Sequence, residues 1–239
     1  MDTPYVREFV EDREITAWFL LDLSPSVDFG TVENERQKRT TMTDFVATLA
    51  RVLTRHGNRV GAILYGGLGS RVDRTIPARG GRAQVLRLIN DVLRQPRLPR
   101  APATDLAPLL EAGQHTIKGR SLVFVLSDFI SVPGWERPLN LLTQRHEVLA
   151  IRLFDRRERQ LPDAGPLIME DAETGQQVYV NTHDSRFRRR FQEAAERREA
   201  TLAAAFARAG VDHAGLATDD DLIEAIVRLS HRRRLRRTA

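Results

Sequence analysis

The sequence contains no cysteine, and this absence excludes several classes of protein at once. A disulfide scaffold, a cysteine-ligated zinc site, a thiol nucleophile and an iron–sulfur cluster all require that residue. Lysine is nearly absent as well, because all but two of the 37 basic residues are arginine; the exceptions are Lys38 and Lys118. The 239 residues, 41% of them hydrophobic, are enough for a domain with a substantial core.

Long hydrophobic runs are also missing. The strongest runs, Ile15 to Leu21 and Leu122 to Leu126, fall well short of the roughly 20 apolar residues that cross a bilayer. The N-terminal residues, Met1 to Tyr5, show no basic region followed by an apolar stretch, so the sequence predicts no signal peptide. We therefore expect a cytoplasmic protein without a transmembrane segment.

The basic charge of the chain is concentrated at its C-terminal end. The formal net charge is +5, and residues 232–239 contain five arginines and no acidic residue. We expect a single domain over residues 1–231 and a disordered basic tail over residues 232–239. An alternative is a tail that binds nucleic acid, but the aromatic residues typical of a single-strand binder are missing between the arginines.

Short apolar runs alternate with longer amphipathic segments along the whole chain. The runs predict strands over 15–21, 60–65, 71–76, 121–126, 147–154 and 211–217, and a hairpin over 167–170 and 177–180. Helices are predicted over 33–55, 80–94, 105–117, 133–145, 185–209 and 219–229. This order predicts an α/β fold with a doubly wound, mostly parallel sheet, an antiparallel edge strand over 71–76 and a peripheral hairpin.

Polar residues with oxygen ligands follow the predicted strands. Asp22, Ser24 and Ser26 come directly after the first strand, Asp128 follows the strand over 121–126, and Thr104 precedes a helix. Open sheets of this class bind ligands beyond the carboxyl ends of their strands. We therefore expect these five side chains to converge on one site.

Two carboxylates and three hydroxyls are hard ligands of the kind that suits Mg²⁺, with Mn²⁺ or Ca²⁺ as alternatives. Because hydroxyls are neutral, a cation held by them stays short of negative charge and attracts a carboxylate from outside. Three alternatives stay open at this point. Ser24, Ser26 and Thr104 could merely cap helices, the cluster could serve a Mg²⁺-dependent phosphoester hydrolase, or the protein could bind nucleic acid through its tail.

The pattern Asp22-x-Ser24-x-Ser26, with Thr104 and Asp128, resembles the metal-ion-dependent adhesion site (MIDAS) of von Willebrand factor A (vWA) domains. The surrounding sequence resembles a bacterial vWA-like branch, the "domain of unknown function 58" family found beside MoxR-type AAA+ ATPases. The similar stretches lie at residues 5–9, 14–26, 58–61, 209–213 and 218–221. The resemblance extends roughly from Pro4 to Leu229.

The resemblance implies a Rossmann-like vWA fold with Mg²⁺ bound at the top of the sheet by these five residues. It also implies a non-catalytic module that binds a protein partner through that partner's Asp or Glu. The module would work as an adaptor for a MoxR-type AAA+ ATPase in the assembly or maturation of another complex. The sequence departs from the family in two ways: Asp28 adds an acid near the site, where we favour a turn-capping role, and the longer N-terminal region usual in the family is missing, as in a short member or a fragment.

Other candidate motifs have simpler interpretations. The six histidines are scattered without an H-x-x-x-H pair, so the sequence does not favour a zinc site. The run from Gly66 to Ser70 lacks the G-K-[ST] ending of a phosphate-binding loop and is interpreted as a hairpin turn. The acids at 219–221 are placed to cap a helix.

Overall fold

The central feature of the computed structural model is a six-stranded sheet with the order β3-β2-β1-β4-β5-β8. The structure describes residues 14–30, 37–67, 69, 71–98, 103–170 and 176–237. The strands are β1 (Thr16–Asp22), β2 (Arg59–Tyr65), β3 (Arg74–Arg79), β4 (Leu122–Ser127), β5 (Glu147–Phe154) and β8 (Asp212–Ala217). Every neighbouring pair is parallel except β2 and β3. The predicted fold class, a mostly parallel sheet with one antiparallel edge strand, is confirmed.

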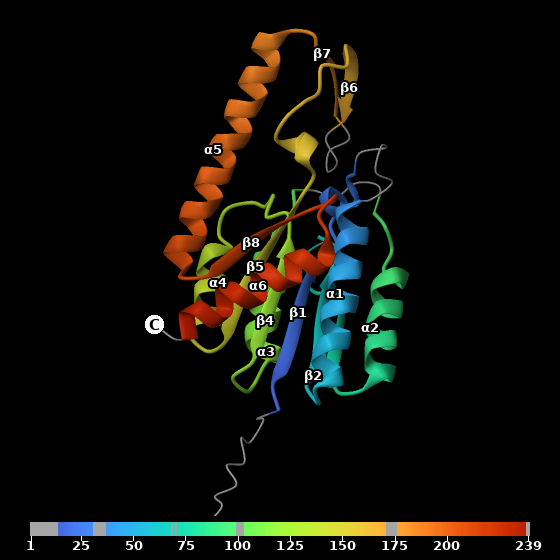
Figure 1. The fold of residues 1–239 in the computed structure, drawn as a ribbon, viewed down its shortest axis with the longest axis vertical. Coiled ribbons are helices and arrows are strands. Elements are labelled where there is room, and N and C mark those ends of the chain that lie inside the picture. Colours follow the sequence, from blue (N-terminus) through green and yellow to red (C-terminus); the bar gives the residue numbers. More distant parts are fainter. Residues whose placement is uncertain are drawn as a thin grey trace, which may run out of the picture.

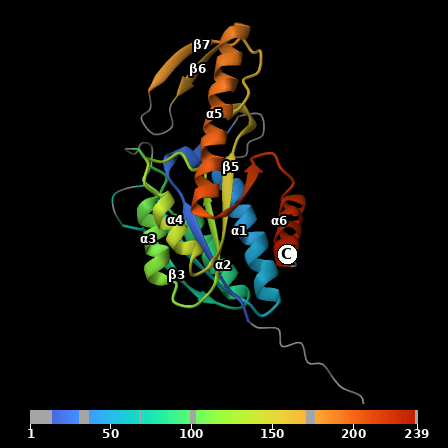
Figure 2. The same cartoon turned by 90° about the vertical axis from the view of Figure 1, so that its left-hand side faces the viewer.

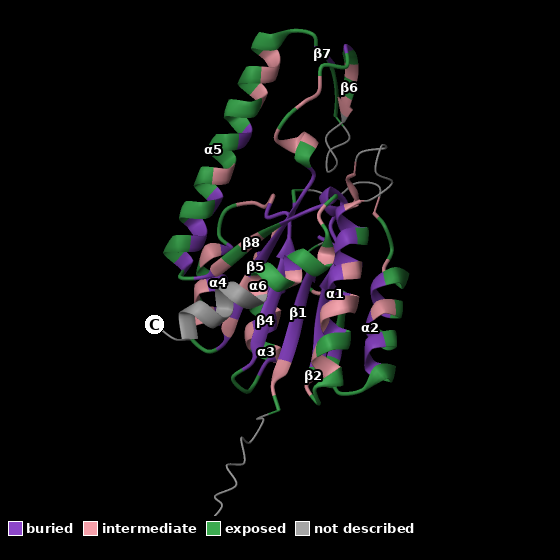
Figure 3. Ribbon diagram, viewed as in Figure 1, coloured by how far each residue is buried: buried purple, intermediate pink, exposed green. Residues whose placement is uncertain are grey.

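Helices cover both faces of this sheet (Figures 1 and 2). One face packs against α1 (Lys38–Arg55), α2 (Arg82–Arg94) and the first part of α6 (Leu222–Arg237). The other face packs against α3 (Ala107–Thr116), α4 (Glu136–Thr143) and the last part of α5 (Ser185–Ala209). Figure 3 shows the result: the central strands β1, β2, β4 and β5 are largely buried, whereas the outer faces of the helices are exposed.

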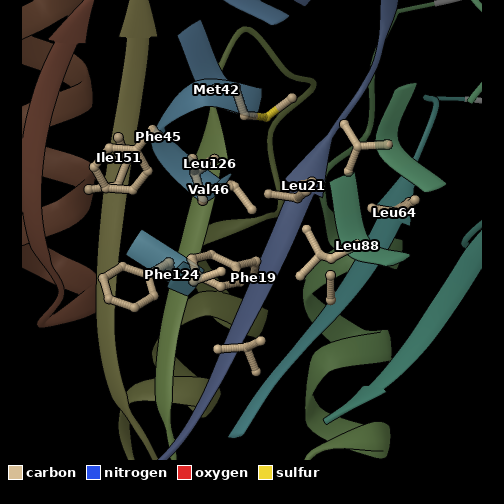
Figure 4. Packing of buried hydrophobic residues seen from close by; sticks show 14 of the residues in the cluster. Phe19, Leu21, Met42, Phe45, Val46, Leu64, Leu88, Phe124, Leu126 and Ile151 are labelled. Atoms are coloured by element: carbon tan, nitrogen blue, oxygen red, sulfur yellow. The ribbon is translucent and has the colours of Figure 1, made fainter. Parts of the chain in front are cut away.

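The continuous apolar sequence of β1 follows from its position between these two layers. Phe19 and Leu21 point into the core beneath α1 and α2, while Trp18 and Leu20 point into the opposite core. Figure 4 shows the first of these cores, where the rings of Phe19 and Phe124 stack with their centroids 5.3 Å apart. A central parallel strand has no solvated face, so it has no alternation of polar and apolar residues.

A second, two-stranded sheet is formed by β6 (Pro166–Glu170) and β7 (Gln177–Asn181), as the predicted hairpin required. Together with the first half of α5 it extends beyond the carboxyl edge of the main sheet (Figures 1 and 2). Ile168 and Tyr179 are cross-strand partners, and both are exposed.

Among the elements whose bounds differ from the sequence predictions are β3 and α6. Strand β3 lies at 74–79 and not at 71–76, because Asp73 still belongs to the preceding loop, where its carboxylate accepts a hydrogen bond from the amide of Gly66. Helix α6 begins at Leu222 and extends to Arg237, so it includes most of the segment predicted as a disordered tail; arginine is a good helix former. The predicted helix start at Glu33 and the motif at 5–9 lie outside the described residues.

In the described parts of the chain, no helix is both long enough and apolar enough to cross a membrane. Of the acids at 219–221, Asp221 caps the helix as predicted, since its carboxylate accepts hydrogen bonds from the backbone amides of Ile223 and Glu224 at the start of α6. Asp219 and Asp220 instead accept hydrogen bonds from the guanidinium of Arg156.

Gly61 of β2 is required by the close approach of Trp18. A methyl group on Gly61 would lie 2.9 Å from the indole ring of Trp18 and 3.0 Å from the backbone nitrogen of Ala78. We expect Gly61→Ala to lower the free energy of unfolding by about 1–3 kcal/mol, because the backbone of β3 cannot move away without losing its pairing. Chemical denaturation measures this difference.

The matched control is Gly119→Ala, since a methyl group on Gly119 would meet no atom within 4 Å. We expect it to change the free energy of unfolding by less than about 0.5 kcal/mol. Equal effects of the two substitutions would contradict the packing argument.

Candidate metal centre

The candidate site lies where the strand order of the sheet reverses. After β1 the chain continues to β2 and β3 on one side of β1, and it then returns to form β4 on the other side. The last residue of β1, Asp22, therefore lies beside the end of β4, where Leu21 is opposite Leu126. In a doubly wound sheet this position is the usual place for a ligand.

Asp22 is completely buried at this edge. Its Oδ1 accepts a hydrogen bond from the backbone amide of Ser24 at 3.0 Å, and its Oδ2 accepts one from the hydroxyl of Ser127 at 2.6 Å. Burial, together with the nearby negative charge of Asp128, raises the pKa of Asp22 from 3.8 to about 6. The hydrogen bonds offset this effect only in part, so the Asp22 carboxylate is short of positive charge.

Ser24 and Ser26 bring two hydroxyls to the same place. The short 3-10 helix η1 (Pro25–Asp28) bends the chain directly after Asp22, and both serines are buried there with their Oγ atoms 3.2 Å apart. Ser24 occupies the N-cap position of η1, but its side chain makes no capping hydrogen bond. The alternative that Ser24 merely caps a helix is therefore wrong.

Thr104 reaches the site from the loop before α3. It is fully buried, and its carbonyl oxygen accepts a hydrogen bond from the amide of Val132, which ties this loop to the one that follows β4. The cap position of α3 belongs to Leu106, not to Thr104. A methyl group on Gly67, which has a φ of +84°, would lie 2.9 Å from Ser24 Cβ and 3.6 Å from Thr104 Oγ1. Thr104 and Ser24 thus line the same small space beside Gly67.

Asp128 follows β4 and is also buried. Its Oδ1 accepts a hydrogen bond from the amide of Ile130 at 3.0 Å, and its Oδ2 lies 2.7 Å from the ammonium nitrogen of Lys38. Burial alone would raise the pKa of Asp128, but the positive charge of Lys38 holds it below its usual value of 3.8. The two carboxylates of the site therefore have opposite pKa shifts, and Lys38 is the main cause of the difference.

The chain leaves Asp128 through a left-handed residue. Phe129 has a φ of +53°, which is rare for a residue with a bulky side chain. Its amide donates a hydrogen bond to Ser127 Oγ at 2.8 Å, and its ring packs edge-on against Phe206, with the centroids 4.8 Å apart. The aromatic packing and the hydrogen bond compensate for the unfavourable backbone and hold Asp128 toward the site.

The donor set fits a hard divalent cation. The structure brings Asp22, Ser24, Ser26, Thr104 and Asp128 together at one edge, and each of them is buried. A cluster of three or more His, Cys, Asp or Glu that could hold a metal is absent from the described part of the chain, so any cation here would depend on hydroxyl oxygens. Hydroxyls and carboxylates are ligands that Mg²⁺ and Ca²⁺ accept.

Asp28 lies outside this set. The sequence favoured a turn-capping role for Asp28, but its carboxylate instead pairs with Arg39 of α1, with 3.1 Å between Nη1 and Oδ2. A second arginine, Arg97, lies 3.8 Å from its Oδ1. Two arginines thus pair with Asp28, one from α1 and one from the loop after α2.

Four further residues that shape the site were not among those predicted from the sequence. Ser127 binds Asp22, Gly67 leaves space beside Ser24, and Lys38 and Glu158 form an ion pair with a distance of 2.8 Å. For Lys38 a signal existed, since it is one of only two lysines in a chain that otherwise uses arginine. No comparable signal marks Glu158, which lies 120 residues away from Lys38 in the sequence.

Because the pKa of Asp22 is raised and that of Asp128 is lowered, we expect the substitution Asp22→Asn to stabilise the protein when excess chelator removes metal ions. With a pKa of about 6 in the fold and 3.8 when unfolded, Asp22 costs free energy once it is ionised. The stability of the wild type should therefore fall relative to Asp22→Asn as the pH rises from about 4 to about 6.5. Above that range the variant should be more stable by up to about 3 kcal/mol. Urea denaturation at pH 4 and pH 7.5 tests this.

The matched variant Asp128→Asn should have the opposite effect under the same conditions. It removes a charged partner from buried Lys38, so we expect it to lower the free energy of unfolding by about 1.5–3 kcal/mol. If both variants shifted stability in the same direction, the pairing of Lys38 with Asp128 and not with Asp22 would be contradicted.

Comparison with known proteins shows the family and the fold. The sequence matches the family described as "Protein of unknown function DUF58" over residues 1–201. The uncharacterized protein Rv1480 of Mycobacterium tuberculosis H37Rv is 34% identical over 231 residues, which cover 97% of this chain and 71% of that protein. The uncharacterized protein MAV169 of Mycobacterium avium is 36% identical over 159 residues, 66% of this chain and 94% of that protein.

Two solved structures share the fold at low sequence identity. The conserved hypothetical protein BatB from Bacteroides thetaiotaomicron has a TM-score of 0.53 and 11% identity, over 85% of this chain and 90% of that one. An aerotolerance-related membrane protein from Bacteroides fragilis has a TM-score of 0.56 and 10% identity, over 88% and 94% of the two chains. The family that the motifs indicated is thus confirmed, and the chain belongs to the DUF58 family.

Proposed function

We propose that this protein is a Mg²⁺-dependent protein-binding module, in which a carboxylate of the partner protein completes the ligands of the cation. Asp22, Ser24, Ser26, Thr104 and Asp128 would form the site of the cation, in which the carboxylates act partly through water. A bound cation would supply the positive charge that recognises the partner's Asp or Glu. The observation that carries the proposal is that Asp22 and Asp128 already accept hydrogen bonds on both of their carboxylate oxygens. Much of their negative charge is therefore compensated by the protein itself.

The remaining donors toward a cation are neutral. Ser24 and Ser26 share a single contact between their hydroxyls, and Thr104 adds a third hydroxyl beside Gly67. Neutral ligands leave most of the positive charge of a cation uncompensated. A site of this kind is suited to binding an external anion strongly.

The family resemblance adds a biological setting to this proposal. The module would act as a cytoplasmic adaptor that works with a MoxR-type AAA+ ATPase in the assembly or maturation of another protein complex. The β6–β7 hairpin and the first half of α5 project beyond the carboxyl ends of the strands, on the side of the candidate site (Figure 1). They enlarge the surface on that side, which supports a role in binding another protein.

The metal requirement is tested by thermal denaturation with increasing Mg²⁺. We expect the wild type to be stabilised in a saturable way, since a ligand that binds only the folded state raises its stability by mass action. Asp22→Ala should abolish the response. Asp212→Asn serves as the matched control, because Asp212 begins β8 at the opposite edge of the sheet, and it should respond like the wild type.

The partner requirement is tested by affinity capture from cells of the source organism, in Mg²⁺ and in excess chelator. A MoxR-type ATPase or its client should be retained in Mg²⁺ by the wild type and by Asp212→Asn, and lost with Asp22→Ala or with chelator. Equal recovery of the same partner in all four samples would rule out a role of the cation in binding.

A further inference from the structure

Lys38 is a buried cation built into the candidate site. It is the first residue of α1, its side chain is 1% exposed, and its ammonium nitrogen lies 2.7 Å from Asp128 Oδ2 and 2.8 Å from Glu158 Oε1. The ring of Phe29 faces the same ammonium, with its centroid 5.6 Å away. The amide of Lys38 donates a hydrogen bond to the carbonyl of Phe29 at 3.0 Å, which fixes the start of α1 over the site.

Glu158 is equally well fixed. It closes a capping box in the loop after β5: its Oε2 accepts a hydrogen bond from the amide of Asp155 at 3.0 Å, while Oε1 faces Lys38. Asp155 is itself buried and accepts a hydrogen bond from the hydroxyl of Thr218. The Lys38–Glu158 pair is therefore a rigid part of the fold and differs from a mobile surface ion pair.

We propose that Lys38 is a positioning residue that holds Asp128 back from direct contact with the cation, and that Lys38 and Glu158 together set how tightly the cation binds. This inference rests on the proposed function. Its physical basis is that Lys38 occupies Asp128 Oδ2 with a positive charge of its own, while the amide of Ile130 occupies Oδ1. A divalent cation near Asp128 would be repelled by the ammonium, and Glu158 would reduce that repulsion.

The other charged groups around Asp128 agree with this assignment. Asp22 contributes a negative charge from β1, and Arg152 of β5 also lowers the pKa of Asp128, but Arg152 is itself paired with Glu199 at 2.6 Å. Among the residues that the structure describes, Lys38 is the basic residue with an ion pair to Asp128.

A lysine suits this position better than an arginine. The ammonium is a compact point charge that fits between two carboxylates, whereas a guanidinium needs a planar, wider arrangement of acceptors. This requirement gives a physical reason for one of the two lysines in a chain rich in arginine. The pairing of Lys38 with Asp128 would also favour the proposed function. A cation whose charge is little compensated by Asp128 keeps its attraction for a partner's carboxylate.

The experiment measures Mg²⁺ binding to the full chain by titration calorimetry at one pH, with Mn²⁺ as a second probe. We expect Lys38→Met, which keeps a similar side-chain volume, to bind Mg²⁺ at least about tenfold more tightly than the wild type. Glu158→Gln, which keeps the shape and removes the negative charge, should bind it more weakly. The double variant should lie between the two, and Lys38→Arg should stay closer to the wild type than Lys38→Met does.

Opposite changes in Mg²⁺ affinity in Lys38→Met and Glu158→Gln indicate a charge effect. Damage to the site would instead weaken binding in both single variants. If Lys38→Met does not fold, Glu158→Gln still decides the matter: weaker Mg²⁺ binding supports the proposal, and unchanged or tighter binding overturns it. A folded Lys38→Met with unchanged or weaker binding also overturns it. If the wild type binds neither Mg²⁺ nor Mn²⁺, the proposed function itself fails, and this result is distinct from the others.

Discussion

The burial of two like-charged carboxylates at the carboxyl edge of the sheet is the constraint on which the rest of the site depends. Asp22 and Asp128 are both fully enclosed, and each raises the cost of ionising the other. A protein can meet such a cost with hydrogen bonds, with a built-in cation or with a bound one. In this protein Asp128 is paired with a lysine, whereas Asp22 has only neutral hydrogen-bond donors. The negative charge of Asp22 is therefore only partly compensated.

The surrounding architecture serves this arrangement. The strand order places the ends of β1 and β4 side by side, and η1 folds back directly after Asp22 so that its two serines face inward. The left-handed Phe129 holds the chain after β4, and α1 places Lys38 over the gap between its carboxylate partners. Each element contributes one or two side chains, which is the usual way in which a rigid sheet supports a site made of loops.

The donor set of the candidate site differs from that of a two-metal hydrolytic centre. Catalysis by two metals needs several carboxylates as bridging ligands, whereas the residues that converge here are mostly hydroxyls. In the proposed function, hydroxyl ligands would not neutralise a bound cation, and its remaining attraction would be directed to an anion that approaches from solvent. The projecting hairpin and α5 then become relevant as a surface on the same side of the molecule, where a partner's other residues could lie.

Local sequence determined the strands, the helices and the list of oxygen donors, because hydrophobic periodicity and the D-x-S-x-S pattern are properties of neighbouring residues. The start of β3 was displaced, since a hydrogen bond from the Gly66 amide to Asp73 extends the loop in a way that periodicity does not record. Only the tertiary structure decided the charge of the site. Lys38, Asp128 and Glu158 are separated by 90 and 120 residues of chain, and burial of an ion pair depends on the packing of α1 against two loops, which no local pattern encodes.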